Sequence, residues 1–270
     1  MKILKPLKKK FLSFLTIFFF AAILFLWLFI RFNNYNLKFE GNKSQKDFFK
    51  SAKLIDYSKY IKVKNSAQLN PQVDNDFSIL FWFKAKNTPA TGTRMPILYK
   101  FNQENKKEGF ALSISNYNNT YRPEIYWNNE ADEGRWFSFN EINLKQKNWN
   151  AFLISFTENK YLGLHFFTLN RKGDVISQNL GGYLVENIIA SSEADLEFGS
   201  VGNKTFSGLF GNLLIINKSK GELELINLIK RIAESPEVDL NELREFSPVV
   251  YINSSLQDDI ANSIVNLESF

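Results

Sequence analysis

The alternation of side chains along residues 76–84 predicts a β-strand at the centre of the fold. In an extended chain, successive side chains point to opposite faces, so every second residue lines the same face. One face of this stretch is wholly apolar and consists of Phe77, Ile79, Phe81 and Phe83. The other face carries Leu80 and Trp82, so we expect a loop or a neighbouring strand to cover it as well. A strand that is covered on both faces is typical of the middle of a packed sheet.

Short β-prone stretches recur between residues 60 and 216. The expected strands are residues 60–64, 77–84, 96–101, 110–115, 124–127, 136–139, 149–156, 162–170, 196–199 and 209–216. Clusters of Asn, Gly, Asp and Pro, which favour turns, separate them. Many short strands separated by such turns predict a mainly β protein, an antiparallel β-sandwich of the jelly-roll type.

The pattern changes after residue 218, and we expect a helical C-terminal extension over residues 219–270. Apolar residues recur at helical spacing over residues 222–233, and residues 249–252 form a candidate strand. A terminal amphipathic helix is predicted by Leu256, Ile260, Ile264 and Leu267. We expect these helices to pack on the sandwich, and a partner-binding arm is the alternative.

An uncharged apolar run covers residues 11–30, which is about the length of a helix that spans a bilayer. A basic tail, residues 1–10, precedes it, and a polar stalk, residues 31–51, follows. The run is longer than the apolar part of a typical signal peptide, and no small-residue cleavage site follows before Arg31. We therefore expect an uncleaved transmembrane signal anchor in the lipid bilayer, with a cytoplasmic amino terminus and an extracytoplasmic body. A cleaved signal peptide is the alternative.

The order of the strand patterns resembles that of laminin G-like domains over residues 52–218. The blocks that carry the resemblance are residues 56–69, 76–84, 110–114, 149–156, 164–175 and the paired ending 196–199 and 206–216. His165 and Phe166 stand where that family often has tyrosine. The resemblance implies a concanavalin A-like jelly roll of the lectin and glucanase type. It also implies calcium as a candidate cofactor, because loop oxygens of Asp and Asn suit this cation.

The candidate calcium ligands by residue type are Asp74, Asn75, Asp76, Asp132 and Glu133. They share no fixed motif spacing, and turn chemistry accounts for the same residue types. Of these residues, we predict that Asp74, Asp76 and Asp132 are the calcium ligands.

Charge and composition exclude several classes of function. Five lysines in residues 1–10 account for the whole net charge of +5, so a basic nucleic-acid-binding surface is not indicated. Cysteine is absent, which excludes disulfides, thiolate metal sites and a cysteine nucleophile. A single histidine, His165, argues against a Ser-His-Asp triad, and its apolar strand predicts a packed side chain.

Glu193, Asp195 and Glu197 would share one face of a strand, which is a carboxylate arrangement that glycosidic-bond cleavage can use. Their spacing is similar to the E-I-D-x-E-F signature of family-16 glucanases. That resemblance would make Glu193 the nucleophile, Asp195 its helper and Glu197 the acid–base. The laminin G-like resemblance accounts for the same stretch without catalysis, so both interpretations stay open.

Aromatic and amide side chains gather between residues 118 and 136 and suggest a platform for sugars. Aromatic rings stack on the apolar faces of sugars, while amides bond to their hydroxyls. The candidate ligand-binding residues are Tyr121, Tyr126, Trp127, Trp136, Asn128 and Asn129. The alternative is that the tryptophans belong to the core.

These observations predict a membrane-anchored extracytoplasmic recognition module that binds a glycan or a surface protein without catalysis. One alternative is a glycoside hydrolase of the same architecture that uses Glu193, Asp195 and Glu197. Another is a structural subunit of a cell-surface assembly that makes contact through its C-terminal helices.

Overall fold

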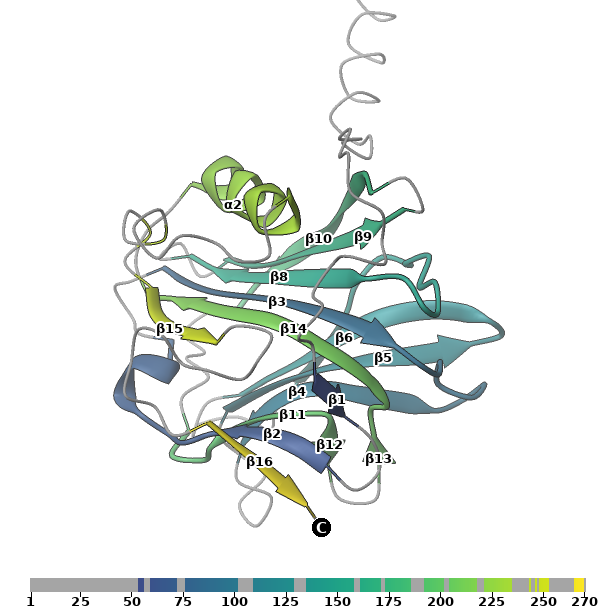
Figure 1. The fold of residues 1–270 in the computed structure, drawn as a ribbon, viewed down its shortest axis with the longest axis horizontal. Helices are drawn as coiled ribbons and strands as arrows, with labels where there is room; N and C mark the ends of the chain where they lie inside the picture. Colours follow the sequence, from purple (N-terminus) through teal and green to yellow (C-terminus); the bar gives the residue numbers. More distant parts are fainter. Residues whose placement is uncertain are drawn as a thin grey trace, which may run out of the picture. The chain divides into compact units, whose positions relative to one another are not determined.

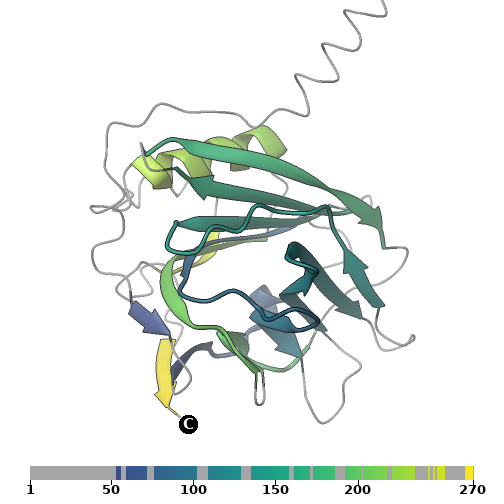
Figure 2. The same cartoon turned by 90° about the vertical axis from the view of Figure 1, so that its right-hand side faces the viewer.

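Two antiparallel seven-stranded sheets face each other and form a β-sandwich (Figures 1 and 2). The computed structural model describes residues 53–55, 59–71, 76–101, 109–128, 135–157, 161–170, 173–185, 192–201, 204–217, 221–234, 243, 246, 248–252 and 265–269. The mainly β sandwich that the alternating stretches predict is therefore confirmed.

Sheet A is one layer of the sandwich. Its order is β1 (Lys53–Ile55), β14 (Gly208–Ile216), β3 (Phe77–Ala85), β8 (Asn150–Phe156), β9 (Tyr161–Leu169) and β10 (Val175–Leu184). β15 (Pro248–Ile252) also pairs with β14. β1 pairs with residues 208–210 of β14 and β15 with residues 213–216, so two short strands share one of its edges. The predicted strand at residues 249–252 is thus confirmed.

Sheet B is the other layer. Its order is β16 (Val265–Ser269), β2 (Lys59–Val63), β11 (Leu196–Phe198), β4 (Arg94–Phe101), β5 (Gly109–Tyr117), β6 (Thr120–Asn128) and β7 (Arg135–Ser138). The remaining elements are the 3-10 helix η2 (Ala67–Leu69), the hairpin β12 (Ser200–Val201) and β13 (Lys204–Thr205), and the helix α2 (Glu222–Glu234).

The terminal amphipathic helix is a wrong prediction over the residues that the structure describes. Leu267 lies in β16, where it pairs with Ile61 of β2. Val265 and Leu267 also alternate as strand residues do, and the edge of β2 supplies backbone hydrogen-bond partners that sequence spacing does not reveal. Leu256, Ile260 and Ile264 lie outside the described residues.

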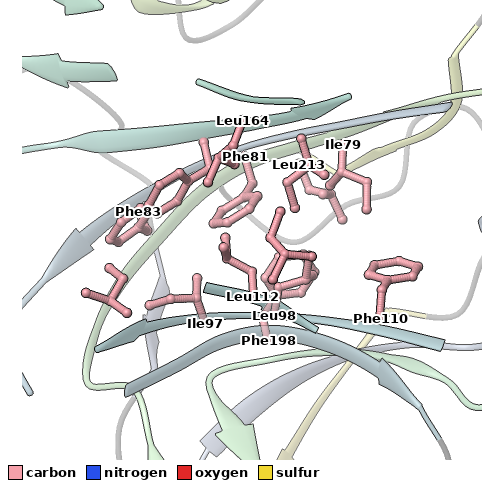
Figure 3. Close-up of a cluster of buried hydrophobic side chains, with 14 of the residues drawn as sticks. Ile79, Phe81, Phe83, Ile97, Leu98, Phe110, Leu112, Leu164, Phe198 and Leu213 are labelled. Carbon is pink, nitrogen blue, oxygen red and sulfur yellow. The ribbon is translucent and has the colours of Figure 1, made fainter. Parts of the chain in front are cut away.

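The sandwich core confirms the predicted inner face of β3, whose four alternating apolar side chains are all buried. Figure 3 shows Ile79, Phe81 and Phe83 of this face between the two layers. The ring of Phe81 lies 6.0 Å from Phe152 of β8 and 5.6 Å from Phe198 of the opposite sheet, measured between centroids. Phe83 stacks on Phe152 at 5.6 Å. Each fully buried phenylalanine contributes about 1.5–3 kcal/mol through the hydrophobic effect, so these rings hold the two layers together.

The outer face of sheet A is covered by α2, which lies across it in Figure 1. Trp82 is 0% exposed there and packs in one apolar cluster with the inner face of the helix. The helix residues in that cluster are Leu225, Ile226, Leu228, Ile229, Ile232 and Ala233. Glu222 and Glu224 in the first turn favour the helix because negative charge stabilises its amino end. Packing of this helix on the sandwich is confirmed, but the cover over Trp82 is a helix rather than the expected loop or strand.

Residues 1–52 lie outside the described residues, so the predicted basic tail, transmembrane segment and stalk fall there. In the part of the chain that the structure describes, no helix is long and apolar enough to cross a membrane.

Candidate functional site

An aromatic pair stands on the outer face of sheet B, at the edge formed by β6 and β7. Tyr126 and Trp136 are direct partners in the strand register. Their ring centroids are 5.3 Å apart with the planes tilted by 53°. Trp136 is 40% exposed, whereas Tyr126 is half-buried, and this burial raises the pKa of the Tyr126 hydroxyl. The pair therefore offers an aromatic surface that solvent reaches.

A guanidinium group completes this surface. The Cζ atom of Arg94, on β4, lies 4.4 Å from the centroid of the Trp136 ring, which is a cation–π contact. The Nε atom of Arg94 donates to Oε2 of Glu124 at 2.5 Å, and Ser138 donates to Oε1 of the same carboxylate at 3.3 Å. Glu124 is 1% exposed and fixes the guanidinium over the indole ring. We name Arg94, Tyr126 and Trp136 the Trp136 platform.

The strand between Arg94 and Tyr126 carries small side chains on this face. Ser115 of β5 pairs with Arg94, and Ala111 pairs with Tyr126. Ser113, between them, pairs with Glu124. A row of small residues between two rows of large ones leaves the aromatic and charged groups as the most prominent features of the face.

A second ion pair lies next to this row. Nη2 of Arg122 donates to Oε1 of Glu141 at 2.7 Å, and both side chains are exposed. The hydrogen bond and the charge of Glu141 raise the pKa of Arg122, so this group stays protonated. Arg122 lies opposite Ser115 in the register, which places it on the same face as Arg94.

The structure separates the residues predicted for a sugar platform. Trp127 is 1% exposed and stacks between Phe110 and Phe156 in the core, so its assignment to an exposed platform is wrong. Strand alternation explains this, because Trp127 and Tyr126 are neighbours and must face opposite sides. Asn128 is also buried, 1% exposed, and Tyr121 is half-buried against the core. Asn129 lies outside the described residues.

Arg94 is the platform residue that sequence patterns missed. It lies more than thirty residues before Tyr126 in the chain, and only the pairing of β4 with β5 and of β5 with β6 brings them together. Its position two residues before the predicted strand at residues 96–101 was the nearest signal available in the sequence.

The acidic stretch at residues 193–197 forms ion pairs instead of a free carboxylate set. Nζ of Lys62 lies 3.3 Å from Oδ2 of Asp195 and 4.0 Å from Oε1 of Glu197. Tyr99 donates its hydroxyl to the other oxygen of Glu197. Glu193 is exposed and precedes β11, so the expectation that it shares a strand face with Asp195 and Glu197 is wrong.

A buried lysine lies behind this stretch. Nζ of Lys100 donates to Oδ1 of Asn65 at 2.8 Å and to the carbonyl oxygens of Ser192 and Ala194 at 2.5 and 2.8 Å. Burial lowers the pKa of Lys100 to about 8, and the charge of Asp195 partly opposes this shift. These bonds tie β4 to the segment before β11, which is a structural role.

Among the candidate calcium ligands, the structure describes Asp76 alone, so their grouping stays a prediction. Asp74 and Asp132 lie outside the described residues, as do Asn75 and Glu133. Asp76 stands at the start of β3 beside a cavity described below. Within the residues that the structure describes, no three His, Asp or Glu side chains gather as a potential metal site.

A cavity of about 80 Å³ opens on sheet A beside the amino end of α2. His165 and Glu222 close one side of it, with 3.1 Å between Nε2 and Oε1. This hydrogen bond lowers the pKa of Glu222, against a smaller effect of burial. His165 is 5% exposed and stacks on Phe167, as expected for a packed histidine.

Comparisons with known proteins give distant likenesses of structure. No family model matches the chain, and no curated protein matches it. A carbohydrate-binding module, the Ruminococcus gnavus IT-sialidase CBM40 bound to α2,3-sialyllactose, aligns with a TM-score of 0.46 at 13% identity, over 65% of this chain and 95% of that one. The binding domain of botulinum neurotoxin serotype G aligns with a TM-score of 0.44 at 13% identity, over 73% of this chain and 46% of that one.

The enzymatically active domain of the bacteriophage CBA120 tailspike protein 2 aligns with a TM-score of 0.43 at 8% identity. The alignment covers 62% of this chain but 25% of the tailspike domain, so this chain spans about a quarter of that protein. The fold described above rests on the strand pairing of this chain alone.

Proposed function

We propose that this chain is a non-catalytic glycan-binding module whose contact surface is the Trp136 platform. The observation that carries the proposal is an indole ring, 40% exposed, held beside a tyrosine and under a guanidinium on a rigid sheet. Aromatic rings positioned by strands bind the apolar faces of sugar rings with little loss of conformational entropy. Neighbouring polar groups then bond to the hydroxyls.

The guanidinium donors of this surface suit a glycan that carries an acidic group. Arg94 uses Nε for Glu124, and its two terminal amino groups make no hydrogen bond to a described residue. A guanidinium whose two terminal amino groups are available suits a carboxylate, which it binds in a bidentate manner. Arg122 supplies a second cationic group on the same face, although Glu141 neutralises it in part.

The contacts of the acidic stretch favour a non-catalytic function over glycoside hydrolysis. A catalytic pair needs one carboxylic acid and one carboxylate beside the scissile bond. Asp195 and Glu197 share the ammonium of Lys62, and Glu197 also accepts a hydrogen bond from Tyr99. These contacts tie both side chains into a network with Lys62 and Tyr99.

We further propose that the sandwich is a laminin G-like domain in the concanavalin A-like class. It is held outside the cytoplasm by the apolar run at residues 11–30, with the basic tail inside. Protease protection in sealed membranes tests this topology. Digestion of the body from the outside while an amino-terminal tag stays protected is the expected result. The reverse pattern, or a soluble mature body, contradicts it.

A glycan array with neutral and acidic glycans, probed with the full-length chain, tests the glycan-binding proposal. We expect binding that Trp136→Ala reduces at least tenfold, because truncation of an aromatic anchor of a binding surface typically costs about 2 kcal/mol or more. Arg94→Ala should selectively weaken acidic glycans. Leu223→Ala is the matched control, because Leu223 is 71% exposed on α2, away from the platform. Binding that is unaffected by Trp136→Ala contradicts the proposal.

A further inference from the structure

We infer that the cavity beside the amino end of α2 is a second binding site, which takes the hydroxyl-bearing edge of a single uncharged sugar ring. The site is formed by side chains on the outer faces of four strands of sheet A and by Glu222 of α2. The inference shares the ligand class of the proposed function but does not depend on the Trp136 platform, which belongs to the other sheet.

The strand register brings the polar groups of the cavity together. Ser78 of β3 pairs with Ser155 of β8, and Ser155 pairs with Gly163 of β9. His165 of β9 pairs with Asn179 of β10. All of these residues line the cavity on the outer face of the sheet.

The cavity is lined by polar side chains that can bond to a ligand. Ser78 is only 5% exposed, and it lines the cavity. His165 is equally buried, lines the cavity as well and uses Nε2 for Glu222. Polar groups at the wall of a cavity can bond to a ligand or to ordered water.

An aromatic wall closes the cavity on one side. Tyr161 lines it and is 41% exposed. A Cβ atom at Gly182 would overlap the Tyr161 ring, and one at Gly163 would lie 2.9 Å from Oγ of Ser155 and 3.3 Å from the ring. Glycine at both positions therefore lets the ring lie against the sheet and keeps the cavity open.

Size and charge define the ligand class. A volume of about 80 Å³ exceeds the roughly 10–15 Å³ that one water molecule needs on this measure, so it admits several ligand atoms. The hydroxyls of two serines and one tyrosine both donate and accept, as sugar hydroxyls do. Asp76 and Glu222 line the same cavity and disfavour an anion, so we expect a neutral sugar here.

The single histidine of the chain is a direct reporter of this site. The experiment follows the imidazole signals of the full-length chain, labelled at histidine, by NMR during titration with methyl glucoside, methyl galactoside and methyl N-acetylglucosaminide. The titration runs to roughly 100 mM, because an isolated monosaccharide site has a millimolar dissociation constant. We expect at least one of the neutral probes to shift the His165 signals saturably and glucuronate to leave them unchanged.

Variants separate this site from the Trp136 platform. Ser78→Ala should weaken the binding seen at His165 by about 2- to 10-fold, since a neutral hydrogen bond contributes about 0.5–1.5 kcal/mol. Tyr161→Ala should weaken it further, and Trp136→Ala should leave it unchanged. If no neutral probe shifts the His165 signals, or if Trp136→Ala abolishes the shift, the second site is refuted. The result of the glycan array for the Trp136 platform is independent of this outcome.

Discussion

Trp82 and Trp136 both point outward from a sheet of the same sandwich, yet their surroundings differ completely. Trp82 is 0% exposed, because α2 covers the outer face of sheet A. Trp136 is 40% exposed, and its neighbours there are a tyrosine and an arginine instead of an apolar helix. An outward aromatic on a strand is therefore buried or open to a ligand according to what packs on its face, and the two faces of this sandwich represent both cases.

The covered face should tolerate truncation least, and Trp82→Ala has the largest expected effect. Loss of a fully buried tryptophan typically costs about 3–5 kcal/mol, which is a large part of the stability of a domain. Chemical denaturation of the variant and of the parent chain measures the difference. A variant with native stability would mean that α2 does not pack on Trp82 as described.

The helix itself can be tested at Ile229, which is 0% exposed in the cluster between α2 and sheet A. We expect Ile229→Ala to cost about 2–5 kcal/mol and to make the helix more sensitive to limited proteolysis. Leu223→Ala on the exposed side of the same helix should change the free energy of unfolding by no more than about 0.5 kcal/mol. Equal effects of the two variants would contradict the assignment of the buried side.

Sheet B holds a buried ionisable group, the amino group of Lys100, beneath its ion-paired outer face. Its pKa is about 8 in the folded chain, below the ordinary value of 10.5, so the unfolded chain binds more protons between these values. Stability should therefore rise with pH from about 8 to 10.5, by on the order of 3 kcal/mol. Lys100→Met should lack that rise when urea midpoints are compared across this range. If the urea midpoints of the parent chain and of Lys100→Met changed with pH in parallel, Lys100 would not be buried as a charged group.

Glu222 provides a smaller test at the margin of the covered face. Its pKa is lowered mainly by the hydrogen bond from His165, so the stabilisation is present above the ordinary value of 4.5. It is lost as the pH falls through the lowered value. Because the carboxylate is largely exposed, we expect Glu222→Gln to cost only about 0.2–1 kcal/mol near pH 6 and to reduce the acid sensitivity below pH 4.5. Thermal unfolding at both pH values measures this, and an unchanged acid profile would contradict the pairing.

The open face should tolerate truncation best. Trp136→Ala is expected to lower the free energy of unfolding by only about 1 kcal/mol, because it removes the ring pair with Tyr126 and the cation–π contact with Arg94 but no fully buried side chain. Chemical denaturation under the conditions used for Trp82→Ala gives the direct comparison. A loss as large as that of Trp82→Ala would show that Trp136 is structural.

Strand positions follow from sequence wherever the alternation is strong. The inner face of β3 could be predicted because four apolar residues alternate without interruption. β10 was not among the predicted strands, because it contains Gly181 and Gly182 and exposed polar residues, and it has a register irregularity between Asn179 and Gly182. Eight of its ten residues pair with β9, and this pairing is a tertiary effect that overrides weak local preference.

The site was predictable only in part, because its residues come from separate strands. Trp136 and Tyr126 were found from their residue types, but Trp127 was wrongly grouped with them although strand alternation places it in the core. Arg94 joins them through two successive strand pairings. The acidic stretch suggested catalysis in sequence, and its contacts with Lys62 and Tyr99 come from strands far away in the chain, so sequence spacing could not reveal them.

The most direct test of the central claim uses the indole N–H signals of the tryptophans during titration with a glycan that the array identifies. The claim is that ligand binds on the open face of sheet B at Trp136. We predict that the Trp136 signal shifts saturably with the dissociation constant of binding. The signals of Trp82, Trp127 and Trp149, each at most 1% exposed, should stay in place. A glycan that binds without moving the Trp136 signal would contradict the account.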